Sequence, residues 1–123
     1  MLKDKKVSLW LGTFSSGEEF DEYVEIKFDE DGNYIKSGFQ KDFQIDKYDF
    51  DSVEKDWIMD SCEDVFSLLA GFSYDNEIIP KFEKMISIDK LRKYNSIILL
   101  YNFQYDECCM NRKMDYIGCV DVE

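Results

Sequence analysis

Hydrophobic patterning predicts three strands that form the centre of the fold. In residues 6–11, three apolar side chains alternate with Ser8 and Trp10, as expected of a half-buried strand. An unbroken apolar stretch runs through residues 96–103 and is typical of a central strand covered on both faces. Residues 116–122 can return beside it as a hairpin partner.

Capping signals predict two helices in the first half of the chain. Ser15 and Ser16 are each followed three residues later by a glutamate, the pattern of a capping box. The helix that follows would bury a stripe made of Phe20, Tyr23 and Val24. Ser37 begins a second short helix, whose inward side chains are Phe39 and Phe43.

Two further helices are predicted in the second half. Ser61 and Asp64 mark the start of one, and Gly71 marks its end. The other places five apolar side chains of residues 78–86 on one face, namely Ile78, Ile79, Phe82, Met85 and Ile86. Pro80 fits only in a first turn, so this helix is expected to begin close to residue 77 or 80.

These elements predict an α+β protein. Residues 53–59 add a weaker strand signal, and no linker or repeat interrupts the chain. We expect a single domain over residues 1–123, with a small, mostly antiparallel sheet that holds the first and last strands. The helices are expected to pack mainly on one face of this sheet.

The amino-acid composition limits the classes of function that the chain could have. The 123 residues carry 15 basic and 27 acidic side chains, a net charge of −12, and no histidine. Such acidity argues against contact with nucleic-acid phosphates, and the commonest general base and zinc ligand is missing. No stretch is long and apolar enough to span a membrane. We therefore expect a binding protein without enzymatic activity, metal or cofactor.

Three partial motifs fail on inspection. Residues 12–17 resemble a phosphate-binding loop, but Glu18 and Glu19 stand where lysine and serine or threonine are required. A calcium loop aligned on Gly32 lacks carboxylates at both ends, so an Asp-Gly turn is the better interpretation. Its acids, Asp29, Glu30 and Asp31, remain a secondary acidic patch. The adjacent thiols of Cys108 and Cys109 cannot easily chelate one zinc.

The negative charge lies in two windows. Residues 18–31 contain eight acids and one lysine, and residues 42–60 contain seven acids and two lysines, which together supply the whole net charge. The first window looks like a solvated helix face. The second mixes acids with aromatics and predicts a partner-binding surface. Its candidate residues are Asp46, Tyr48, Asp49, Phe50, Asp51, Glu54, Asp56 and Trp57.

Segments along nearly the whole chain, in order, resemble the immunity protein 22 family. They are KVSLWLGTF, EEFDEYVEIKFDEDG, FQKDFQID, LLAGFSYDNEIIP, YNSIILLYNFQYD and YIGCVDVE. The resemblance implies a cytoplasmic bacterial protein that binds and neutralises a polymorphic toxin encoded beside it, often of the nuclease type. The acidic surface would then take the place of nucleic-acid phosphates in a basic toxin groove.

Two alternatives remain open at this point. The acids at residues 29–31 could belong to a small enzyme or ligand-binding domain that uses carboxylates and a divalent ion. The chain could instead act as a general nucleic-acid mimic on some other basic protein.

Overall fold

The centre of the molecule is a four-stranded antiparallel sheet with the strand order β4-β5-β1-β6. Its strands are β1 (Leu2–Gly12), β4 (Val53–Trp57), β5 (Ser96–Phe103) and β6 (Met114–Asp121). The computed structural model describes residues 2–45, 48, 52–58, 64–87, 93–105 and 114–122. β5 matches the predicted range, and the weak signal at residues 53–59 corresponds to β4.

β1 occupies a more interior place than its pattern indicates. Leu9 pairs with Leu99 of β5 on one side and with Gly118 of β6 on the other. Ser8 and Trp10 are both fully buried, so the strand is covered on both faces. The prediction of a half-buried strand was wrong because Ser8 is accommodated by a hydrogen bond, its Oγ donating to the Phe103 carbonyl at 2.8 Å.

The pattern predicted that β6 would be a hairpin partner of β5, and this prediction was wrong. β6 pairs with β1, which separates it from β5, although the first and last strands do share the sheet as predicted. The reason is that β1, being apolar on both faces, is best placed as a central strand, with partners on both edges.

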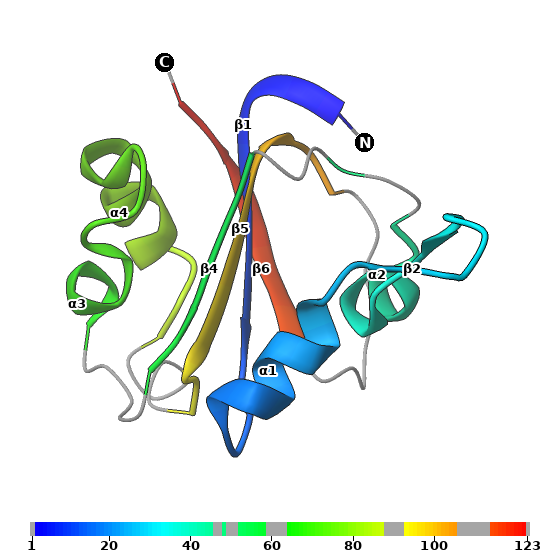
Figure 1. The fold of residues 1–123 in the computed structure, drawn as a ribbon. Coiled ribbons are helices and arrows are strands. Elements are labelled where there is room, and N and C mark those ends of the chain that lie inside the picture. The colour runs from blue at the N-terminus through cyan, green and yellow to red at the C-terminus, as the bar shows by residue number, and fades with distance from the viewer. Residues whose placement is uncertain are drawn as a thin grey trace.

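Helices cover both faces of the sheet (Figure 1). On one face lie α3 (Val65–Leu69) and α4 (Asp75–Glu83), and on the other lie α1 (Gly17–Val24) and α2 (Gly38–Phe43). The α+β class and the antiparallel sheet are confirmed, but the expectation that most helices share one face was wrong. Both core layers are needed because the two central strands are apolar on each side.

The residues predicted to cap helices form capping hydrogen bonds at α1, α2 and α3. Ser16 caps α1 by accepting from the Glu19 amide at 3.1 Å, and Ser37 forms a reciprocal capping box with Gln40 at α2. Asp64 accepts from the Ser67 amide at 2.6 Å at the start of α3. The predicted start at Ser61 lies outside the described residues. Gly71 follows α3 with a φ of +96°, a left-handed conformation suited to glycine.

α4 departs from its prediction at both ends. It begins at Asp75, so Pro80 lies inside the helix and not in its first turn. Pro80 is exposed, while Ile78, Ile79 and Phe82 are buried against the sheet, and this packing outweighs the lost backbone hydrogen bond. Met85 was predicted to lie on the apolar face of this helix. It follows the helix instead and is 48% exposed.

A two-stranded hairpin completes the fold. β2 (Lys27–Phe28) and β3 (Tyr34–Ile35) enclose the predicted Asp-Gly turn, where Gly32 has a φ of +81°. The hairpin projects from the side of the molecule that carries α1 and α2 (Figure 1). No helix in the described part of the chain is long and apolar enough to cross a bilayer.

Candidate partner-binding surface

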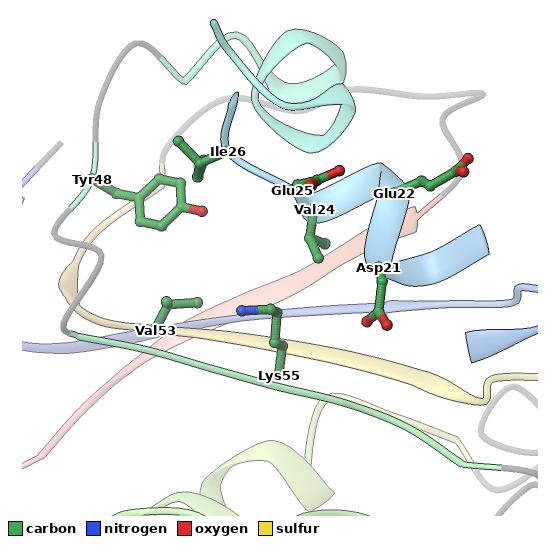
Figure 2. A pocket seen from close by; sticks show the side chains of 8 residues that line it. All are labelled: Asp21, Glu22, Val24, Glu25, Ile26, Tyr48, Val53 and Lys55. Atoms are coloured by element: carbon green, nitrogen blue, oxygen red, sulfur yellow. The ribbon is translucent and has the colours of Figure 1, made fainter. Parts of the chain in front are cut away.

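A groove of about 450 Å³ lies between α1 and the edge strand β4 (Figure 2). α1 buries Phe20, Tyr23 and Val24 against the sheet, and its acidic residues lie on the remaining surface of the helix. The residues that line the groove are Asp21, Glu22, Val24, Glu25, Ile26, Tyr48, Val53 and Lys55.

The groove brings the two acidic windows of the sequence together. Asp21, Glu22 and Glu25 come from the first window, and Lys55 comes from the second. Asp21 extends from α1 toward the sheet, while Lys55 rises from β4 toward the helix (Figure 2). Among the described lining residues, three carboxylates against one ammonium group make the groove negative. α1, expected to be a solvated helix face, thus forms one wall of a concave acidic surface.

Tyr48, predicted to belong to the partner-binding surface, is only 6% exposed. Its ring lies edge-on to that of Phe39, with centroids 6.4 Å apart, and forms part of the groove lining. Burial raises the pKa of Tyr48 to about 12, because the ionised phenolate would be poorly solvated there. The described geometry therefore gives this residue a packing role beneath the groove.

Trp57 also contributes to packing. The half-buried indole donates from Nε1 to the carbonyl of Phe14 at 3.2 Å. A Cβ added to Gly17 would lie 3.4 Å from the indole ring, so the ring sits over the start of α1. This contact joins the end of β4 to the start of α1.

The acids of β4 point to the opposite face of the sheet from Lys55. Side chains alternate along a strand, and Val53 and Trp57 pack with the core on the α1 side, whereas Ile58 packs with the core on the α3 side. Glu54 and Asp56 therefore lie on the α3 side. The predicted residues Asp46, Asp49, Phe50 and Asp51 lie outside the described residues.

The β2–β3 hairpin presents the acids predicted to form a secondary patch. Asp29, Glu30 and Asp31 are all exposed at its turn. Beside them, Phe28 is 63% exposed, Ile35 39% and Tyr34 36%. The rings of Phe28 and Tyr34 pair across the hairpin with centroids 6.2 Å apart. The signal that could have revealed this surface is the placement of two aromatics directly around an acidic turn.

Asp29 organises that turn. Its Oδ1 accepts from the amides of Asp31 at 2.9 Å and Asn33 at 2.8 Å. The Asn33 backbone amide and the other hydrogen bonds lower the pKa of Asp29 below its usual value, against the opposing effect of desolvation. Within the described ranges, no group of three or more carboxylates or thiols is arranged to hold a metal ion.

Comparison with known proteins identifies one family. The family model described as Immunity protein 22 matches residues 7–123. No curated protein and no solved structure matches the chain significantly. The family match spans all the strands and helices described above except the first residues of β1. The chain therefore belongs to the immunity protein 22 family.

Proposed function

We propose that this protein neutralises a bacterial polymorphic toxin by binding its toxin domain, with no chemistry of its own. Membership of an immunity protein family supports toxin neutralisation in general. The observation that carries the finer proposal is the groove between α1 and β4, where Asp21, Glu22 and Glu25 line a concave surface in which Lys55 is the single cation among the described lining residues. The toxin partner is a basic domain of the nuclease type, inhibited in the cytoplasm.

The mechanism is substitution of carboxylates for phosphates. A nuclease that binds nucleic acid presents lysine and arginine side chains along its substrate groove. The net charge of −12 attracts such a surface over several ångströms and speeds encounter. Acids arranged along α1 then occupy the positions of substrate phosphates, so the toxin cannot bind its substrate.

The acids of the second window would also contribute to association with the toxin domain. Asp56 is exposed on β4, next to the groove but on the other face of the sheet. Together with Asp46, Asp49 and Asp51 of the same sequence window, it would add to the negative charge that attracts a basic partner. These residues would act by raising the rate of association and not by anchoring the complex.

Co-expression tests the function directly. The toxin domain encoded beside the gene for this chain should arrest growth when produced alone and should be harmless when this protein is co-produced. A purified pair should form a stable complex. Failure of both rescue and binding would refute the proposed function.

Charge neutralisation along α1 tests the surface. The triple variant Asp21→Asn, Glu22→Gln, Glu25→Gln should associate with the toxin domain roughly tenfold more slowly at low salt, and with weaker salt dependence. Glu83→Gln is the control for the loss of one negative charge elsewhere on the surface. Glu83 is exposed at the end of α4, on the opposite side of the sheet. Equal association rates for the triple variant and the wild type would exclude this groove as the contact.

A further inference from the structure

The β2–β3 hairpin exposes a cluster of large apolar side chains. Within the described part of the chain, five large hydrophobic residues are exposed, and three of them lie on this hairpin, namely Phe28, Tyr34 and Ile35. The other two, Tyr74 and Met85, flank α4 and have no such neighbours. Exposed apolar side chains that are gathered, and not scattered singly, mark surfaces that bind a partner.

The turn of the hairpin is fixed by Asp29 and not by Phe28. Each strand has only two residues, and the turn is fixed by hydrogen bonds from backbone amides to Asp29. Phe28 is 63% exposed, so most of its ring faces solvent and not the core. A rigid, exposed aromatic ring buries a large area on binding while losing little conformational entropy, which is the property of interface anchors.

The charges beside this apolar cluster define its partner. Asp29, Glu30 and Asp31 are exposed at the tip, each within three residues of Phe28 or Tyr34. A second copy of this chain would bring identical acidic tips together against a net charge of −12 on each molecule. Anionic lipid headgroups would also repel the tip. A protein with a basic rim around an apolar cleft complements both features.

We propose that the β2–β3 hairpin is the anchor of the toxin complex, with Phe28 and Tyr34 seated in an apolar cleft that has a basic rim on the toxin domain. This inference rests on the proposed function and adds to it a second contact, on a different part of the surface from the groove beside β4. The groove guides association, whereas the hairpin slows dissociation.

The experiment compares matched variants against the toxin domain encoded beside this gene. Phe28→Ala should weaken binding at least roughly tenfold, mainly through faster dissociation, because it removes the apolar anchor. Asp31→Asn should mainly slow association. Tyr74→Asn is the control, since Tyr74 is 53% exposed near α4 and asparagine tolerates its left-handed conformation. Thermal unfolding should be unchanged in Phe28→Ala, which separates lost binding from lost folding.

These measurements distinguish failure of the hairpin contact from failure of toxin neutralisation. If the wild-type protein binds and rescues growth but Phe28→Ala binds equally well, the hairpin is not the anchor and the proposed function stands. If the wild-type protein neither binds nor rescues, both fail. A Phe28-dependent dimer in sedimentation of the free protein would also overturn the inference, because the cluster would then be a contact between copies.

Discussion

Both carboxylate oxygens of Glu54 on β4 accept hydrogen bonds from Ser73, which lies between α3 and α4. Oε1 accepts from the Ser73 amide at 2.8 Å, and Oε2 accepts from its hydroxyl at 3.1 Å. The Ser73 carbonyl in turn accepts from the Tyr101 hydroxyl at 2.8 Å. One of the acids predicted to contact a partner thus fixes the helical layer to the sheet.

Glu54→Ala should therefore destabilise the fold. The loss of two hydrogen bonds to a charged acceptor should lower the free energy of unfolding by about 1 kcal/mol, measured by urea denaturation. Asp56→Ala is the matched control, because the Asp56 carboxylate bonds only to the adjacent Trp57 amide among the contacts described. A double-mutant cycle with Ser73→Ala should give a coupling free energy, and additive effects would contradict the structural role.

Alkaline solution should expose the burial of Tyr48. Its pKa is raised to about 12, so the folded state holds the phenolic proton more tightly than the unfolded state, where the pKa is near 10. The stabilisation is complete below pH 10 and is lost as the pH rises through 12. Urea midpoints from pH 8 to 12 should fall less steeply for Tyr48→Phe than for the wild type. Parallel curves would show that Tyr48 ionises freely in the folded protein.

The contact between α1 and α2 should not tolerate a larger residue at Gly38. A Cβ there would lie 3.0 Å from Cδ1 of Tyr23 and 3.3 Å from its carbonyl oxygen. The Tyr23 ring cannot easily move, because its hydroxyl donates to Asp42 at 2.7 Å. Gly38→Ala should cost about 1–2 kcal/mol in urea unfolding, whereas Lys41→Ala on the exposed side of α2 should be nearly neutral. An unchanged midpoint for Gly38→Ala would show that the helices can separate.

The parts of the fold that were predictable from sequence are those set by local chemistry. The caps at Ser16 and Ser37 and the end of α3 at Gly71 depend on neighbouring residues, and each was predicted. The placement of β6 beside β1 and the burial of Ser8 and Trp10 depend on the far side of the sheet, which a local pattern does not contain.

The candidate surface was predictable in its charge but not in its geometry. Both acidic windows are visible in the sequence, yet only folding brings Asp21 of α1 across from Lys55 of β4. The burial of Tyr48 was not predictable, because its polar neighbours in sequence are not its neighbours in space. Phe28 and Tyr34 flank the turn in the sequence, but the core could equally have buried them.

Lys55 offers a test in which removing a charge should improve binding. Among the described residues, it is the one cation that lines the groove beside α1, and its ammonium group partly offsets the field of Asp21, Glu22 and Glu25. Lys55→Ala should therefore speed association with a basic toxin domain by roughly threefold at low salt, and the advantage should vanish as salt screens the charges.

Lys84→Ala is the matched control for this prediction. It makes the same change in net charge, but Lys84 is exposed at the end of α4, on the other side of the sheet. Stopped-flow association rates across a salt series would separate a local effect of the groove from a general effect of net charge. If both variants accelerate binding equally, total charge and not the groove beside β4 steers the partner.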